Sequence, residues 1–412
     1  MQYVNELDMN KPNGDERQAE ERQEKGRCAN RYSLCNPYGI DEKTQRWVEK
    51  IWEKLSVKLE AECIRLGTMM PYVPVNGKYE DMGQRELSAW TNGFYSGILW
   101  QMYHATKKEC FKNAAEGIEK RLDAALAEYT KLDHDVGFLW LHTAVADYRL
   151  TGNESSRRRG LHAAGILAGR YNPAGRYIKA WNGERSGIAI VDCLMNLPLL
   201  YWASEQLSDN AYRQIAVNHT EMALHYILRP DGSCNHMVDF NPVTGEYRGN
   251  PGGQGYESGS SWSRGQAWAI YGMALAYRYT GKEAYLDAAK RTAHYFCANL
   301  AVHDYIPLLD FRAPEQPVYY DTTAGACAAC GLLELAEHVK PLEKDLYVKS
   351  SIRCLQALTE NFCVWNPEED AILSHGSARY DRASDREVPI IYGDYFLTEA
   401  ILRLRNQDFL IW

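Results

Sequence analysis

Residues 187–202 read GIAIVDCLMNLPLLYW, a run that is apolar on nearly every face if it is helical. A helix that is apolar all round is buried on all sides. Five more segments share this character: 92–104, 136–150, 263–280, 321–337 and 390–404, and the first extends to residue 203. Six amphipathic segments alternate with them: 44–63, 110–129, 155–169, 208–228, 283–299 and 344–360. Because an amphipathic helix keeps one face in water, the two kinds of helix predict an inner and an outer layer.

This alternation predicts an all-α fold, an (α/α)6 barrel of six helical hairpins in which an inner ring is wrapped by an outer ring. The turns from an inner to an outer helix resemble one another, as in a weak internal repeat: TGNESS at 151, LSDNAY at 207, TGKEAY at 280 and LEKDLY at 342. An open helical solenoid is the alternative. We expect residues 41–412 to form a single catalytic barrel, preceded by a polar N-terminal extension over residues 1–40.

Composition narrows the class of protein. The chain of 412 residues has a net charge of −8, which argues against a nucleic-acid partner and requires local cations for any acidic ligand. No apolar run is long enough to span a membrane, and residues 1–30 lack the apolar core of a signal peptide. The 11 cysteines fall mostly within helical patterns, which predicts free thiols in a reducing compartment, the cytoplasm.

Sequence motifs for cofactors and metals are missing or weak. The chain has no P-loop and no HExxH pattern, and GGQG at 252–255 follows no strand, so it is not a dinucleotide fingerprint. Cys327 and Cys330 form a CxxC without a second such pair, and we interpret both as core thiols. We therefore expect neither a metal nor a cofactor.

The barrel predicts where the site lies. Helices that alternate up and down place all inner N-termini at one end, which gathers partial positive charge. The longer connections fall at the same end: 64–91, 171–186, 229–262, 300–320 and 361–389. We expect the site among these loops and the first turns of the inner helices.

Two aspartates near these helix starts could perform acid–base chemistry. Asp192 is flanked by apolar residues inside an inner segment, and a buried carboxyl without a cation nearby has a raised pKa, as a general acid requires. Asp135 stands at the start of the second inner helix, where a helix cap is the alternative. Together they could form the carboxyl pair of sugar hydrolysis. A hydrogen-bonded structural role is the alternative for Asp192.

The Gly-rich stretch from His236 to Trp268 is a long polar loop that enters an apolar helix near Ser263. Loops of this length inside a compact domain are usually functional. Arg264 and Trp268 stand four residues apart and would share a helix face. A cation beside a flat ring suits an anionic sugar, whereas an exposed loop followed by a core aromatic is the alternative.

Six strings resemble the unsaturated glucuronyl hydrolases of glycoside hydrolase family 88. They are SAWTNGF, LDHDVGFLW, GIAIVDCLMNLPLL, DGSCNH, GQGYESGSSWSRGQAWAIYG and IIYGDYFLTEA, which begin at residues 88, 132, 187, 231, 253 and 390. Their order and spacing agree with the family as well as their residue types. The resemblance implies an (α/α)6 barrel, in agreement with the alternation of helices.

The resemblance also implies roles for individual residues. Asp192 matches the general acid/base, and Asp135 matches the second essential aspartate. The substrate-binding residues implied in the same way are Trp90, Trp181, His236, Gln254, Arg264 and Trp268. Ser374, Ser377 and Arg379 resemble a Ser-x-x-Ser-x-Lys element that some members use for a sulfated sugar, with arginine here in place of lysine.

The reaction that the resemblance implies is release of a 4,5-unsaturated uronic acid from the non-reducing end of an acidic oligosaccharide left by a lyase, through hydration of the C4=C5 vinyl ether. Alternatives are an unsaturated rhamnogalacturonyl hydrolase of pectin fragments and an inverting hydrolase of saturated sugars. A non-catalytic sugar-binding barrel and a sugar epimerase are further alternatives, although an epimerase would require a pair of histidine bases. The sequence leaves the linkage, the sulfation preference and the oligomeric state open.

Overall fold

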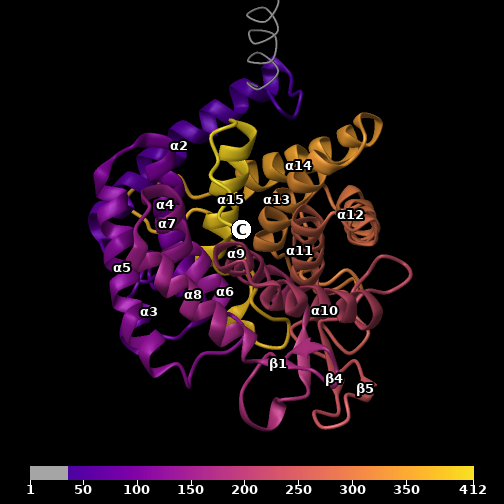
Figure 1. Ribbon diagram of the computed structural model, residues 1–412. Helices are drawn as coiled ribbons and strands as arrows, with labels where there is room; N and C mark the ends of the chain where they lie inside the picture. The colour runs from indigo at the N-terminus through magenta and orange to yellow at the C-terminus, as the bar shows by residue number, and fades with distance from the viewer. Residues whose placement is uncertain (1–35) are drawn as a thin grey trace, which may run out of the picture.

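The computed structural model describes residues 36–412, which form a closed double ring of helices (Figure 1). The inner helices are α4 (Phe94–Thr106), α6 and α7 (Val136–Trp140 and Ala146–Thr151), α9 (Pro198–Leu207), α11 (Ser263–Thr280), α13 (Thr322–His338) and α15 (Ile391–Leu404). The outer helices are α2 (Glu42–Leu66), α5 (Glu109–Glu128), α8 (Glu154–Ala168), α10 (Asn210–Tyr226), α12 (Glu283–Ala301) and α14 (Pro341–Asn361). A short helix, α3 (Met82–Arg85), lies in the connection before α4.

Helix contacts close both rings. Neighbouring inner helices touch in chain order, and the last, α15, packs against the first, α4. Each inner helix packs against the outer helix that follows it, and α15 packs against α2, the first outer helix. Burial matches this arrangement, because every residue of α15 is buried whereas α2 buries one face. The predicted (α/α)6 barrel is confirmed, and the open solenoid is excluded by the closure of the ring.

The third inner segment differs from the prediction of one helix over 187–203. Its first residues form strand β3 (Ile188–Ile190), a 3-10 turn covers Val191–Met195, and only α9 is α-helical. Pro198 begins α9, where its missing N–H costs no hydrogen bond. Asp192 therefore lies in the 3-10 turn and not inside a helix, which corrects the sequence-based placement.

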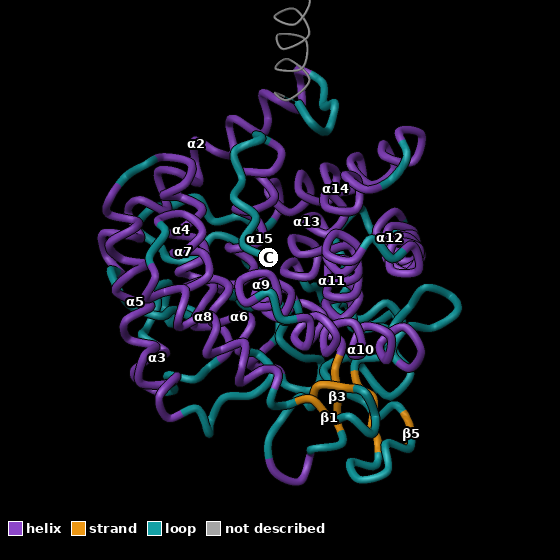
Figure 2. The backbone as a smooth tube through the Cα atoms, viewed as in Figure 1, coloured by secondary structure: helices purple, strands orange, loops and turns teal. Residues whose placement is uncertain are grey.

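Short strands form on one side of the barrel. Strand β3 pairs antiparallel with β4 (Met237–Phe240), which pairs with β5 (Tyr247–Gly249), and β1 (Tyr171–Asn172) pairs with β2 (Tyr177–Ile178). Figure 2 shows the strands together below the helices. The sheet matters for function because β3 and β4 hold the segments of Asp192 and His236 side by side: the N–H of Val191 donates to the carbonyl of His236 at 3.0 Å.

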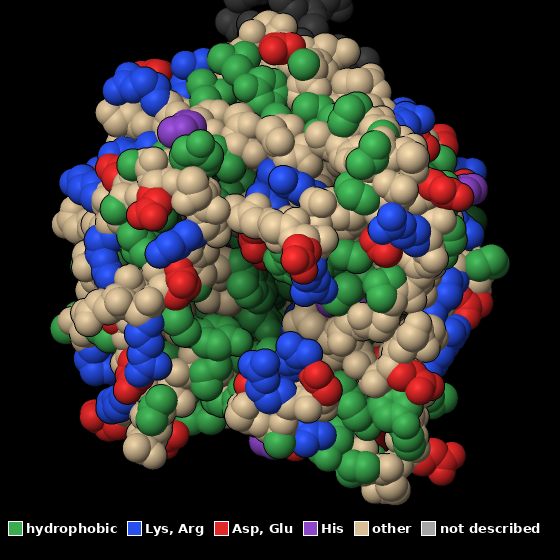
Figure 3. All heavy atoms as spheres, turned by 90° about the horizontal axis from the view of Figure 1, so that it is seen from below, with side chains coloured by type: hydrophobic (Ala, Val, Ile, Leu, Met, Phe, Trp, Pro, Cys, Tyr) green, Lys and Arg blue, Asp and Glu red, His purple; other side chains and the backbone are tan. Residues whose placement is uncertain are grey.

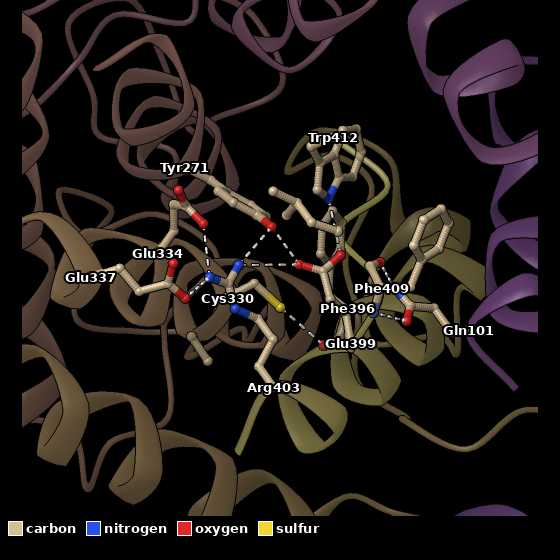
Figure 4. Close-up of polar contacts among 12 residues, drawn as sticks. Gln101, Tyr271, Cys330, Glu334, Glu337, Phe396, Glu399, Arg403, Phe409 and Trp412 are labelled. Carbon is tan, nitrogen blue, oxygen red and sulfur yellow. Dashed lines mark hydrogen bonds and ion pairs between the residues drawn. The ribbon is translucent and has the colours of Figure 1, made fainter. Parts of the chain in front are cut away.

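The end of the barrel at which α13 and α15 finish is closed by a polar network and by the C-terminus of the chain (Figure 4). Arg403 of α15 is 1% exposed and donates to Glu334 at 2.7 Å and to Glu337 at 2.8 Å. Trp412, which has no solvent exposure, donates its Nε1–H to Glu399 at 2.9 Å. Charged groups buried here are thus paired, as burial requires.

The predicted extension over residues 1–40 lies outside the described residues up to residue 35. The last part packs on the barrel, because Tyr38 and Ile40 are buried and the Tyr38 hydroxyl donates to Glu337 at 2.9 Å. Cys327 and Cys330 are fully buried in α13, as expected for core thiols. Among the described helices, none is both long and apolar enough to cross a membrane.

Candidate active site

Asp192 and His236 face each other at the heart of the site. Nε2 of His236 lies 3.4 Å from Oδ2 of Asp192, and no other group within residues 36–412 hydrogen-bonds to either atom. Both residues are nearly buried, with 8% of His236 and 9% of Asp192 exposed. The histidine Nδ1 accepts the backbone N–H of Gln254 at 2.9 Å. Since Nδ1 is an acceptor, the proton of the neutral ring is on Nε2 and points at the carboxylate.

Gly253 makes this arrangement possible. A Cβ at position 253 would lie 1.8 Å from Nδ1 of His236, inside any real contact distance. Only glycine therefore lets the backbone before Gln254 approach the imidazole ring. The GGQG string noted in the sequence is thus explained by packing against a histidine rather than by phosphate binding.

Asp135 is held by polar groups of its own segment and of the turn that carries Asp192. Its Oδ1 accepts from Nδ2 of Asn196 at 3.1 Å and lies 3.5 Å from Nε2 of His134. Asn196 also accepts the N–H of Phe138 through Oδ1, at 2.8 Å, so one amide fixes both the carboxyl and the first turn of α6. The Asp133 carboxylate accepts the Asp135 N–H at 2.9 Å. Asp135 precedes α6 without capping it through its side chain.

The two aspartates have opposite pKa shifts. Burial raises the pKa of Asp135 well above its ordinary value, and the charges of Asp133 and Asp192 raise it further. Burial also acts to raise the pKa of Asp192, but the hydrogen bond and charge of His236, together with His134 and Arg264, outweigh it, and the pKa falls below the ordinary value. The expectation of a raised pKa at Asp192 was therefore wrong, because it assumed that no cation stands nearby.

Arg264 is a buried anchor. It is 1% exposed, pairs with Asp321 at 2.8 Å, and donates to the carbonyls of Ser377 and Ala378. Gln254 also donates its side-chain N–H to Ala378, at 2.8 Å, so both residues clamp the loop that contains Ser377. Within the described chain Nε of Arg264 has no hydrogen-bond partner, which leaves one donor for a ligand.

The predicted cation–ring pair of Arg264 and Trp268 is not formed. The guanidinium lies 4.5 Å from the ring centre of Trp262 and 5.2 Å from that of Tyr392. Trp268 has no exposed surface and packs between Phe138 and Phe396. Trp262, the residue before α11, takes the place beside the guanidinium that was expected for Trp268.

The two other predicted tryptophans lie in separate places. Trp90 is half-buried and stacks on Tyr392, with ring centres 5.2 Å apart and planes 28° apart. Because Tyr392 also lies beneath Arg264, the rings of Trp90, Tyr392 and Trp262 are together named the aromatic wall. Trp181 is half-buried and carries the guanidinium of Arg185 at 3.8 Å over its ring. It packs near Met237 in a small cluster apart from the main core.

The predicted sulfate element has internal hydrogen bonds. The Ser374 hydroxyl donates to the carbonyl of Phe362 at 2.7 Å, and the Ser377 hydroxyl donates to Tyr320 at 2.7 Å. Arg379 is ion-paired with Asp381. Ser377 is also fully buried, so its hydroxyl fixes the loop in this structure.

Sequence reasoning missed five residues that shape the site: His134, Asn196, Gly253, Asp321 and Tyr392. Asp321 and Tyr392 stand at the starts of the last two inner helices, but their contact with Arg264 has no sequence signal. Asn196 follows the 3-10 turn of Asp192, and its side chain contacts Asp135 and Phe138, which are distant in the chain, so no local pattern signals it.

The described residues also include a group with the chemistry of a metal site. Ligand atoms of Asp133, His134 and Asp135 all lie within 4.8 Å of one another. His134 is fully buried, and burial lowers its pKa to about 3, so its ring is neutral. The Asp133 carboxylate, however, already accepts the N–H of Asp135. The group is therefore organised first as a turn that orients Asp135.

The surface agrees with a concave site. Seen from the side on which the strands lie, the molecule is hollowed near its middle (Figure 3). Hydrophobic side chains line the hollow, and Lys and Arg side chains stand at its edge. Such a combination of apolar lining and a few polar groups is typical of ligand sites.

A closed (α/α)6 barrel with two buried carboxyls, Asp135 and Asp192, fits a glycoside hydrolase. The chain belongs to Glycosyl Hydrolase Family 88, whose family model matches residues 68–306.

Curated relatives of known activity agree with this membership. An unsaturated glucuronyl hydrolase of Bacillus sp. (strain GL1) is 36% identical over 77% of this chain and 86% of its own length. An unsaturated chondroitin disaccharide hydrolase of Streptococcus agalactiae serotype III (strain NEM316) is 34% identical over 89% of this chain and 93% of its own.

The fold is shared with solved structures as well. The crystal structure of the Bacillus sp. GL1 unsaturated glucuronyl hydrolase, described as responsible for glycosaminoglycan degradation, matches with a TM-score of 0.81 and 34% identity. The match covers 86% of this chain and 95% of that one.

Proposed function

We propose that the protein removes a 4,5-unsaturated uronic acid from the non-reducing end of glycosaminoglycan-type oligosaccharides produced by lyases. The observation that carries this proposal is a pair of buried carboxyls, Asp135 and Asp192, whose pKa values are shifted in opposite directions. Membership of family 88 and the activities of the relatives support it. We assign catalysis to the barrel formed by residues 41–412, and we expect neither a metal nor a cofactor to take part.

The unsaturated sugar contains a vinyl ether, C4=C5–O5, which accepts a proton at C4. In our proposal the carboxylic acid of Asp192 donates that proton, and positive charge develops at C5 and O5. Water then adds to C5 and returns a proton to the Asp192 carboxylate. The resulting hemiketal opens at the C5–O5 bond, and the hemiacetal left at C1 expels the remaining glycan.

Asp192 has a low pKa in the free enzyme although it must donate a proton, and substrate binding should raise that pKa. The uronate brings a negative charge next to Asp192 and displaces water, and both effects raise the pKa of a carboxyl. Asp135, whose pKa is already raised, holds the proton of the pair before binding and supplies it to Asp192 directly or through water. A group that cycles between acid and base requires this kind of tuning.

The uronate carboxylate needs donors, and the aromatic wall offers them. Nε of Arg264 and Nε1 of Trp262 are buried and have no hydrogen-bond partner in the described part of the chain. They lie on adjacent groups, because the guanidinium covers the Trp262 ring at 4.5 Å. A carboxylate bound there would satisfy both donors, which supports recognition of a uronic acid.

Hydration of the double bond has a direct assay. The ultraviolet absorbance of an unsaturated chondroitin, hyaluronan or heparin-type disaccharide should disappear during turnover, and Asp192→Asn should abolish that loss while the protein stays folded. Loss of the double bond also separates this function from inverting hydrolysis of saturated sugars, which the same two carboxyls could perform. Near-normal turnover by Asp192→Asn would remove the assignment. Comparison of sulfated with unsulfated disaccharides tests the sulfation preference.

The compartment remains a proposal. All the cysteines in the described residues are free, which fits a reducing environment, and we propose the cytoplasm. Acidic unsaturated oligosaccharides would then have to be imported before hydrolysis.

A further inference from the structure

We propose that Tyr256, Tyr319, Tyr380 and Arg386, named here the rim platform, bind the third sugar of a longer substrate, a second uronic acid. This inference rests on the proposed function and extends it from disaccharides to oligosaccharides. The rim platform combines flat rings for the C–H faces of a sugar with one cation for its carboxylate.

The three rings form one continuous surface. The Tyr256 and Tyr380 rings meet edge to face with centres 5.1 Å apart, and Tyr380 meets Tyr319 with centres 5.6 Å apart. Tyr256 is 39% exposed, while Tyr319 and Tyr380 are half-buried. Exposed tyrosine rings leave apolar surface in contact with water, and a ligand that covers the rings gains the free energy of burying that surface.

Arg386 supplies the charge. Its guanidinium lies 4.1 Å from the ring centre of Tyr319. The neighbouring arginines are neutralised, since Arg379 pairs with Asp381 and Arg382 pairs with Asp385. Within residues 36–412, Arg386 forms no ion pair, so its charge is available for an acidic sugar.

The loop that presents Tyr256 is held by a buried carboxylate, that of Asp310. The Asp310 carboxylate accepts the backbone N–H groups of Tyr256 at 3.0 Å and of Ser261 at 2.9 Å, and the Ser260 hydroxyl at 2.6 Å. One buried carboxylate thus fixes the loop that presents Tyr256. A preorganised binding surface loses little entropy on binding.

Direct contacts connect the rim platform to the catalytic carboxyl. His236 lies 3.4 Å from Asp192 and accepts from Gln254, and the Gln254 carbonyl accepts the N–H of Tyr380 at 2.8 Å. The Tyr380 ring then meets Tyr319, which carries Arg386. The path from Asp192 to Arg386 passes through several residues, so the rim platform is separate from the catalytic pair, and in our proposal it contacts the later sugars of the same chain.

Substrate chemistry selects the third sugar. Glycosaminoglycans alternate a uronic acid with an amino sugar, so lyase products are disaccharides, tetrasaccharides and longer even-numbered chains. In a tetrasaccharide the first sugar is the unsaturated uronate at Asp192, the second is the amino sugar, and the third is again a uronate. A disaccharide ends before the rim platform, whereas a tetrasaccharide brings a carboxylate to Arg386.

The test compares an unsaturated chondroitin disaccharide with the corresponding tetrasaccharide. Arg386→Gln and Tyr319→Ala should each lower kcat/KM on the tetrasaccharide ~10-fold, the size of one charge-assisted contact, mainly through KM. Turnover of the disaccharide should change less than about twofold. The matched control is Arg382→Gln, on the same loop and already ion-paired, which should alter neither substrate.

Equal losses on both substrates, or an unchanged tetrasaccharide rate, would overturn the proposal. Titration calorimetry with the Asp192→Asn protein and the intact tetrasaccharide measures the same contact without turnover, and added salt should remove the effect of Arg386→Gln. A wild-type protein that fails to hydrolyse the disaccharide would instead refute the proposed function. If Asp192→Asn binds the tetrasaccharide no more tightly than the disaccharide, the rim platform is refuted on its own.

Discussion

His236 presents Nε2 to Oδ2 of Asp192 at 3.4 Å because its Nδ1 is occupied by the backbone N–H of Gln254. This contact is a main reason that the pKa of Asp192 lies below its ordinary value in spite of burial. Replacement of His236 by alanine should therefore raise the pKa of Asp192. Asp192 would then keep its proton to a higher pH, and the protonated carboxyl is the form that donates to C4 in the proposed reaction.

The measurement is the pH profile of kcat/KM, which reports the ionisations of the free enzyme. Its alkaline limb should move to higher pH in His236→Ala, together with a loss of activity of roughly 100-fold or less at the optimum, as expected for one acid–base partner. A lower rate with an unmoved alkaline limb would show that His236 binds substrate without tuning Asp192.

Gly253→Ala should inactivate the enzyme without a mutation in any group that contacts substrate. The new Cβ would lie 1.8 Å from Nδ1 of His236, so the ring or the loop must move. We expect a fall in kcat of about 100-fold, the size that small misplacement of catalytic groups produces. Gly252→Ala is the matched control, because its Cβ would meet nothing closer than 3.2 Å. Full activity of Gly253→Ala would contradict the tight fit.

Most of the barrel could be predicted from the sequence because the burial of a helix determines how apolar residues are distributed along its segment. Five of the six inner segments were placed within a few residues, since a buried helix is apolar on all faces. The third failed because an apolar run does not separate a buried strand from a buried helix. The β-branched Ile188 and Ile190 and the later Pro198 were the available signals for a strand followed by a new helix.

Site residues were easier to identify than their contacts. Asp192, His236 and Arg264 were singled out by type and place, yet the contact of His236 with Asp192 depends on strand pairing between distant segments. The neutralisation of Arg264 by Asp321 depends on two adjacent inner helices. No local pattern encodes either contact, and for that reason the direction of the Asp192 pKa shift was wrong.

Glu62 should make the protein less stable as the pH rises. It is 1% exposed on α2, and burial, followed by the charge of Asp394, raises its pKa to about 8. A carboxyl whose folded pKa exceeds the unfolded value favours folding at low pH, and this contribution is lost as pH rises from the ordinary glutamate range through about 8. Glu62→Gln removes this titration, so the Tm of the variant relative to that of the wild type should rise between pH 5 and 8.

The measurement is thermal unfolding of both proteins across that range. Glu53→Gln serves as the control, because Glu53 is exposed on the same helix and its replacement should shift Tm by the same small amount at every pH. A Tm difference for Glu62→Gln that stays constant with pH would show that Glu62 is ionised in the folded protein.

Glu334, at the closed end of the barrel, should have the opposite effect to Glu62: its contribution to stability should be lost at low pH. It is fully buried, accepts from Arg278 at 2.5 Å and from Arg403 at 2.7 Å, and contacts His338 at 2.8 Å. Burial opposes its ionisation, but Arg403 and the hydrogen bonds from His338 and Arg278 outweigh burial and lower the pKa. Its stabilisation is therefore present above the ordinary glutamate pKa and lost as pH falls.

Glu334→Gln should cost roughly 3–5 kcal/mol near neutral pH, because it leaves the buried Arg403 with one partner fewer. Glu337→Gln, also a partner of Arg403 but with 36% of its side chain exposed, should cost less because water can replace its contacts. Urea unfolding measures both, and the deficit of Glu334→Gln should shrink as pH falls and the wild type loses the same charge. Equal costs for the two variants would mean that burial of the Arg403 network adds nothing to stability. The kcat of both variants should be unchanged, because the network lies at the end of the barrel opposite the site.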